Sequence, residues 1–229
     1  MEPQQPTLHL GFGHLATRCD TGPVEEPIVV AVVLAAGAGT RFRGAGHKLD
    51  APIDDGSAVI DRAVRSAVAS GIGPIVVVTA GQLATALPPA ILHVVNEQWA
   101  EGQITSLHAG IAAAAELGAE AVVVGLGDQP FVTVDAWRAV AAVDAPIAVA
   151  TYDGRHGHPV RLRHDTWDLL PRHGDEGARS VLQRRPDLVA EVPCDGSPID
   201  IDTVEDLRRW QNSSSTSSPS TGPSTRRGR

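Results

Sequence analysis

The chain has 229 residues, of which 42% are hydrophobic and only 3% are aromatic. This length and composition predict one α/β domain with a sizeable core. A formal net charge of −8 argues against nucleic acid as the main partner, because phosphate backbones bind basic surfaces. No apolar stretch is long enough to cross a membrane, and the N-terminus lacks the pattern of a secretion signal. We therefore expect a cytoplasmic protein with no membrane partner.

The two ends of the chain differ in composition from its middle. Residues 1–27 are rich in Pro, Gly and Glu without periodicity, and we interpret them as a flexible leader. Residues 213–229 are rich in Ser, Thr and Pro and cannot bury enough apolar surface to fold, which predicts a disordered tail. The folded domain is expected over residues 28–212.

Strand and helix patterns alternate through this domain. In chain order they are a strand at 28–34, a helix at 57–70, strands at 75–79 and 91–95, a helix at 104–117, a strand at 121–126, a helix at 134–143, strands at 147–151 and 159–162, helices at 165–170 and 178–184, a further segment at 188–192 and a helix at 204–210. Alternation of this kind predicts a three-layer α/β/α, Rossmann-like fold with a mostly parallel sheet. Ligands of such sheets bind where the strands end.

The first strand runs into a loop of small residues followed by two cations. Residues 35–39 let backbone N–H groups approach an anion closely, and Arg41 and Lys48 supply positive charge for phosphate oxygens. The loop lacks the Lys-Ser/Thr ending of a P-loop, and Phe42 replaces the third glycine of a dinucleotide-binding fingerprint. A tight turn alone would account for the glycines but not for the two cations. The nucleotide-binding residues expected in this loop are Leu34, Ala35, Ala36, Gly37, Ala38, Gly39, Thr40, Arg41 and Lys48.

Polar residues also follow two later strands. Thr105 and Ser106 stand near the start of a helix, where their hydroxyls either cap the helix or bind a ligand. Asp128 follows the strand at 121–126, at a position that directs a carboxylate into the ligand crevice, although an Asp there can also simply form a turn. Asp200 and Asp202 alternate on an extended segment and should share one face. Either of these two carboxylates could instead cap the last helix.

These segments together resemble the MobA-like nucleotidyltransferases, and most closely the molybdenum cofactor cytidylyltransferases. The resemblance spans residues 29–210 and rests on the loop Leu-Ala-Ala-Gly-x-Gly-x-Arg-Phe followed by Lys, on Asn-x-x-Trp-x-x-Gly-x-x-x-Ser-Leu at 96–107, on Gly-Asp-Gln-Pro at 127–130, on Gly-His-Pro-Val at 157–160, on Gly-Asp-x-Gly-Ala-Arg at 174–179 and on Asp-Ile-Asp-Thr-x-Glu-Asp-Leu at 200–207. It implies that Asp128 and Asp202 bind Mg²⁺. It also implies that Asn96, Ser106, Gly127 and Asp128 join the nucleotide site, while His158, Arg179 and Asp200 lie on the acceptor side.

The resemblance implies transfer of an NMP unit from an NTP to a phosphorylated acceptor, with Arg41, Lys48 and Asp128 as the catalytic residues. The NTP would be CTP and the acceptor molybdopterin, with delivery of the product to a molybdoenzyme. Ala36 favours CTP, because the guanylyl branch resembles Leu-Ala-Gly-Gly at this point. Three alternatives stay open: another small-molecule or sugar-phosphate nucleotidyltransferase, an oxidoreductase of dye-like substrates on the same fold, and a non-catalytic carrier of the cofactor.

Overall fold

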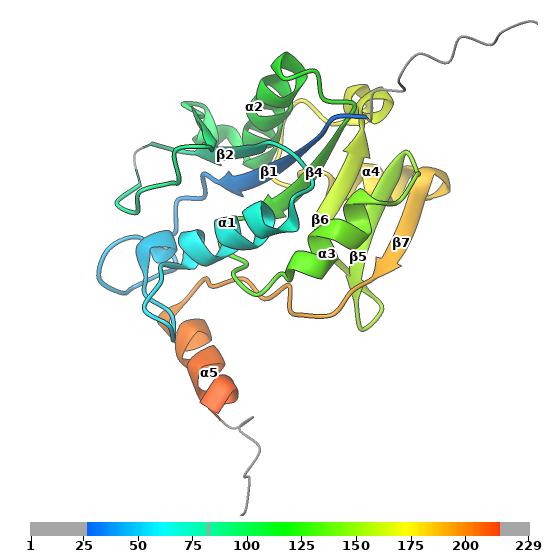
Figure 1. Cartoon of the computed structure of the whole chain (residues 1–229). Helices are drawn as coiled ribbons and strands as arrows, with labels where there is room; N and C mark the ends of the chain where they lie inside the picture. Colours follow the sequence, from blue (N-terminus) through cyan, green and yellow to red (C-terminus); the bar gives the residue numbers. More distant parts are fainter. Residues whose placement is uncertain (1–26, 82, 216–229) are drawn as a thin grey trace, which may run out of the picture.

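The computed structural model describes residues 27–81 and 83–215, and within them seven strands form one sheet (Figure 1). The strands are β1 (Val29–Ala35), β2 (Ile75–Thr79), β3 (Leu92–Val95), β4 (Ala121–Leu126), β5 (Ile147–Tyr152), β6 (Arg155–Arg163) and β7 (Val189–Pro193), in the order β3-β2-β1-β4-β6-β5-β7. β6 is antiparallel to both of its neighbours, β4 and β5. The other neighbouring pairs are parallel, so the predicted, mostly parallel α/β sheet is confirmed.

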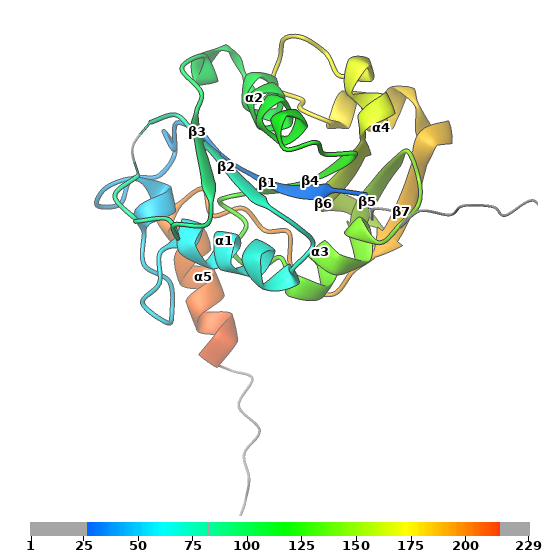
Figure 2. The same cartoon turned by 45° about the horizontal axis from the view of Figure 1, so that its top comes forward.

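Helices cover both faces of this sheet (Figure 2). On one face lie α1 (Val59–Ser70) and α3 (Val134–Ala141), and on the other lie α2 (Gln103–Glu116) and α4 (Arg179–Arg184). Short 3-10 turns occupy Lys48–Asp50, Trp99–Glu101, His164–Leu169 and Pro186–Leu188. The last helix, α5 (Val204–Ser215), projects from the α1 side of the domain. None of the helices in the described ranges is both long and apolar enough to span a membrane.

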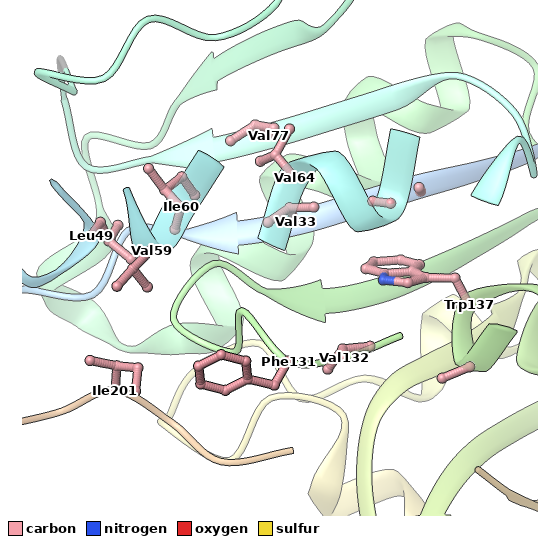
Figure 3. Packing of buried hydrophobic residues seen from close by; sticks show 14 of the residues in the cluster. Val33, Leu49, Val59, Ile60, Val64, Val77, Phe131, Val132, Trp137 and Ile201 are labelled. Carbon is pink, nitrogen blue, oxygen red and sulfur yellow. The ribbon is translucent and has the colours of Figure 1, made fainter. Parts of the chain in front are cut away.

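The core follows from the alternation of side chains along the buried strands. Ala31 and Val33 of β1 point into the cluster that contains α1 and α3, whereas Val30 and Val32 point into the cluster beneath α2. Figure 3 shows the first cluster, in which the ring of Phe131 and the fully buried Ile201 lie beneath α1. Since both faces are covered, β1 is apolar along its whole length.

One glycine sets how closely α2 approaches the sheet. A Cβ added at Gly110 would lie 2.5 Å from Cγ1 of Val32, well inside van der Waals contact. The missing side chain therefore lets α2 pack directly on β1, which holds the first turn of α2 near the end of the strand.

Most predicted elements match the described ones within two residues, and the differences lie in the second half of the domain. β6 begins at Arg155, four residues before the predicted strand at 159–162, because it forms a hairpin with β5. The helix predicted at 165–170 is a 3-10 helix at His164–Leu169. α5 continues to Ser215, past the predicted domain end at 212. Residues 1–26 of the predicted leader and residues 216–229 of the predicted tail lie outside the described residues.

Candidate active site

The ends of β1 and β4 bring the first loop and Asp128 together. The two strands are parallel and paired in register up to Leu34 and Leu126, so the loops that follow them start side by side. The N–H of Gly127 donates to the carbonyl of Leu34 at 2.8 Å. A Cβ at Gly127 would lie 2.9 Å from that of Ala35, so glycine is what permits this approach. This contact places Asp128 directly beside the first loop.

The first loop is held by a histidine that the sequence analysis did not single out. Gly39 adopts a left-handed φ of 61°, which lets the chain turn so that the N–H of Phe42 donates to its carbonyl at 2.9 Å. Nδ1 of His47 accepts from the N–H of Leu49 at 3.3 Å, which leaves Nε2 as the donor to the carbonyl of Gly37 at 3.1 Å. His47 thus ties the loop to the 3-10 turn that carries Lys48.

Lys48 is the centre of the site. It is the only lysine of the chain and is just 7% exposed. Its Nζ donates to Oδ2 of Asp128 at 2.6 Å and to Oδ1 of Asp202 at 2.8 Å. The second bond joins Lys48 to a residue 154 positions further along the chain. Burial alone lowers the pKa of Lys48, but the two carboxylates outweigh it and hold the pKa above its ordinary value. Lys48 is therefore a fixed positive charge at neutral pH.

Arg41 completes this group from the exposed side. Its guanidinium lies 2.8 Å from Oδ2 of Asp202, and its side chain is 75% exposed, compared with 21% for Asp202. Asp202 thus contacts Lys48 with one oxygen and Arg41 with the other. The four residues Arg41, Lys48, Asp128 and Asp202 form one cluster, which we call the charged cluster. An exposed arginine can turn towards a ligand, whereas the buried lysine is held in place.

The C-terminal segment is docked onto the Asp128 loop by hydrogen bonds. The N–H of Ile201 donates to the carbonyl of Asp128 at 2.9 Å. The buried amide of Gln129 donates to Oδ1 of Asp200 at 2.8 Å and to the carbonyl of Pro198 at 3.0 Å. Since Ile201 is fully buried between the two aspartates, Asp200 and Asp202 are fixed on the same side of the segment. Gln129 is a positioning residue that the sequence analysis left without a role.

The capping alternative for the two aspartates is resolved by the next residues. Thr203 and Asp206 form the expected reciprocal pair: the N–H of Asp206 donates to Oγ1 of Thr203 at 3.1 Å, and the N–H of Thr203 donates to Asp206 at 2.9 Å. This pair caps α5, which leaves the Asp202 carboxylate to Lys48 and Arg41. Burial, followed by the charge of Asp128, raises the pKa of Asp200.

A cleft of about 310 Å³ opens beside the charged cluster. Six of the predicted nucleotide-site residues line it, namely Leu34, Ala36, Gly37, Ala38, Ser106 and Asp128. Asn96 lies behind this wall, where its amide donates to the hydroxyls of Thr105 at 2.8 Å and Ser106 at 2.9 Å. The remaining lining residues come from the end of β4, the 3-10 turn at Trp99–Glu101, the start of α2 and the segment before α4. They are Leu126, Trp99, Ala100, Gly102, Gln103 and Asp175.

Comparison with known proteins agrees with this arrangement. The profile of the family described as MobA-like NTP transferase domain matches residues 31–192. The chain belongs to this family. It is 31% identical over 205 residues to nicotine blue oxidoreductase of Paenarthrobacter nicotinovorans, covering 82% of this chain and 98% of the relative. It is 29% identical to the purine catabolism protein PucB of Bacillus subtilis (strain 168), and the match covers 80% of this chain and 96% of that protein.

Solved structures give the same result for the fold. Rv0371c of Mycobacterium tuberculosis H37Rv in complex with manganese is 28% identical, with a TM-score of 0.67, and the match covers 81% of this chain and 99% of that one. The three-layer nucleotidyltransferase fold predicted from the sequence is therefore confirmed, as is membership of the MobA-like family.

The donor set of this MobA-like site fits a divalent ion. Oδ2 of Asp128 and Oδ1 of Asp202 both lie within hydrogen-bond distance of one nitrogen, so both oxygens can reach a common point. Mg²⁺ prefers one or two carboxylates together with phosphate oxygens and water. Within the described ranges, no three His, Cys, Asp or Glu side chains form a closed metal site. Asp128 and Asp202 are thus suited to a metal that is held partly by its substrate.

Of the predicted acceptor-side residues, His158 and Asp200 lie close enough to Asp128 to be affected by its charge, and Arg179 acts in the same way on His158. Burial lowers the pKa of His158 to about 4, against the opposing influence of Asp128 and with a further lowering by Arg179. His158 is therefore neutral at physiological pH. Its carbonyl accepts from the hydroxyl of Tyr152 at 2.7 Å, which fixes the backbone at this point. Arg179 begins α4 and is exposed.

Proposed function

We propose that this protein is a Mg²⁺-dependent nucleotidyltransferase that transfers CMP from CTP to a phosphorylated acceptor of the molybdopterin type. The observation that carries the proposal is the charged cluster beside a cleft lined by Ala36, Gly37 and Ala38. Small residues that let backbone N–H groups approach an anion suit a triphosphate, and two cations with two carboxylates suit a metal-bound one. The manganese complex of Rv0371c supports a divalent ion in this family.

In the proposed reaction an oxygen of the acceptor phosphate attacks the α-phosphorus of CTP. The new P–O bond forms as the bond from the α-phosphorus to the oxygen bridging to the β-phosphorus breaks. Pyrophosphate leaves with that electron pair. Asp128 and Asp202 would hold the metal, which supplies charge neutralisation for the phosphate oxygens. Lys48 stabilises the charge that develops on the phosphates, Arg41 turns from Asp202 towards them, and the first loop positions the donor.

The proposal is tested by pyrophosphate release. The purified chain would be incubated with each of the four NTPs, Mg²⁺ or Mn²⁺ and a panel of acceptors comprising molybdopterin with bound molybdenum, metal-free molybdopterin and sugar 1-phosphates. We expect release that needs CTP, the metal and a pterin acceptor. Release only with a sugar phosphate would assign the chain to the other nucleotidyltransferase class. Tight binding of molybdopterin without turnover would indicate a carrier that delivers the cofactor to a molybdoenzyme.

A second candidate function comes from one relative. Nicotine blue oxidoreductase is 31% identical to this chain, and its name describes an oxidoreductase and not a transferase. The matched test is consumption of NADH or NADPH with a quinone-like dye, measured on the same preparation. The two readouts separate the two functions, because pyrophosphate release needs an NTP, whereas hydride transfer consumes NAD(P)H without one. We expect no NAD(P)H consumption above the level of a heat-inactivated sample.

A further inference from the structure

The cleft contains a second carboxylate that the proposed chemistry does not use. Two aspartates line it, Asp128 and Asp175. Asp128 is bonded to Lys48, whereas across residues 27–81 and 83–215 no hydrogen bond or ion pair engages the carboxylate of Asp175. A carboxylate that faces a ligand cleft without a protein partner is available to a ligand.

Asp175 is held at the cleft wall by backbone contacts with the start of α2. The carbonyl of Gly174 accepts from the N–H of Ile104 at 3.3 Å. Gly102 has a φ of 119°, and a Cβ there would lie 2.5 Å from this carbonyl and 2.9 Å from Oδ1 of Asp175. Further back, the ring of His108 bonds the carbonyl of Pro171 at 2.9 Å. The segment 171–175 is therefore pinned across the first turns of α2.

Capping of α2 does not explain this aspartate. A capping carboxylate accepts from a backbone N–H of the first turn. Here the N–H of Ile104 bonds the carbonyl of Gly174, and that of Thr105 bonds the carbonyl of Gly102 at 3.1 Å. In the part of the chain that the structure describes, no N–H of α2 donates to Asp175. Its carboxylate is left to face the cleft.

Different parts of the cleft suit the phosphates and the base of a nucleotide. A triphosphate is repelled by the carboxylate of Asp175 and belongs beside the first loop and Arg41. Gly102 lies against Asp175, and the 3-10 turn just before it brings Trp99, which is 37% exposed, to the same wall of the cleft. A nucleobase is flat and apolar on its faces and polar at its edge, so it suits this wall.

We propose that Asp175 selects the donor nucleotide by accepting a hydrogen bond from the exocyclic amino group of cytosine. An ionised carboxylate only accepts hydrogen bonds, so the amino group of cytosine is favoured. Uracil presents a carbonyl oxygen at the same position, which would face the carboxylate as a second acceptor. This inference rests on the proposed function, because it assumes that the cleft binds an NTP.

The test is equilibrium binding, which needs no acceptor. Isothermal titration calorimetry would measure the Kd of CTP, UTP and dCTP for the full chain with Mn²⁺, for the wild type and for Asp175→Asn. The asparagine amide can turn its NH₂ towards the uracil carbonyl, so it removes the discrimination while keeping the size of the side chain. Glu176→Gln is the matched control, because it removes one negative charge from the neighbouring exposed position. Thermal melting would verify that both variants are folded.

We expect the wild type and Glu176→Gln to bind CTP about tenfold or more tightly than UTP, and Asp175→Asn to bind the two about equally. An unchanged preference in Asp175→Asn overturns the inference, as does a wild type without any preference. If Asp175→Asn loses affinity for CTP but not for dCTP, the inference is overturned too, since Asp175 would then contact the ribose. Failure of the wild type to bind any NTP would instead refute the proposed function, together with this inference.

Discussion

Replacing Lys48 with Met tests the charged cluster most severely. Methionine keeps the length and apolar stem of lysine but removes the ammonium group that bonds Asp128 at 2.6 Å and Asp202 at 2.8 Å. Loss of one partner costs 3–5 kcal/mol for a buried ion pair and about 1 kcal/mol or less for an exposed one. The two aspartate side chains are 20% and 21% exposed. We therefore expect a loss of about 2 kcal/mol in the free energy of unfolding.

The pH range for this measurement follows from the direction of the pKa shift. The pKa of Lys48 is raised in the folded protein, so its contribution to stability is complete below the unfolded pKa of about 10.4 and is lost only above it. The deficit of Lys48→Met should be constant between about pH 7 and 9.

Urea denaturation of both proteins would measure the deficit, with Arg43→Met as the control because Arg43 is an exposed cation in the same loop. Mn²⁺ should stabilise Lys48→Met more than the wild type, since the ion then meets two carboxylates without a competing ammonium. Pyrophosphate release should fall about 10²–10³-fold. An unfolding free energy equal to that of the wild type would refute the reasoning, because the two contacts would then contribute nothing.

Three further changes test the supports of the site. Gln129→Leu breaks the bond to Asp200 and should cost about 1–3 kcal/mol in urea denaturation while slowing pyrophosphate release; wild-type values for both would refute its positioning role. Gly110→Ala adds a Cβ at 2.5 Å from Val32 and should lower stability by about 1–3 kcal/mol, and an unchanged melting temperature would contradict the close packing of α2. The pKa of His158 is lowered to about 4, so the unfolded chain binds a proton that the folded protein does not, and wild-type stability should fall as the pH drops from 6.5 towards 4. His158→Gln should lose about 2 kcal/mol less over this range in urea denaturation, and an equal loss would contradict the neutral imidazole.

The strands and helices near the site follow closely from the sequence. β2 and β4 have the predicted bounds, because continuous β-branched runs buried on both faces have few alternative structures. The carboxyl ends of parallel neighbours meet at one edge, so the convergence of Leu34 and Leu126 was predictable as well. Local patterns were sufficient at these positions.

What the sequence could not provide depends on contacts between distant segments. β6 is inserted antiparallel between β4 and β5, and no local pattern encodes which strands pair. The sequence marked Lys48 and Asp128 for opposite partners, phosphate and metal, and did not predict that they bond each other. Asp202 joins them only because the C-terminal segment docks onto the Asp128 loop. Asp175 reaches the cleft only because residues 171–175 lie across α2. Spacing in the sequence carries no signal for such a contact.

A single lysine makes a direct measurement possible. Lysine labelled with ¹³C at the ε-carbon gives one side-chain NMR signal, which reports Lys48 alone. The central claim is that a divalent ion and a nucleoside triphosphate bind at Lys48, Asp128 and Asp202. Mn²⁺ with CTP should therefore broaden this signal beyond detection, and Mg²⁺ with CTP should shift it. A lysine signal that stays sharp and unmoved at saturating Mn²⁺ and CTP would contradict the claim.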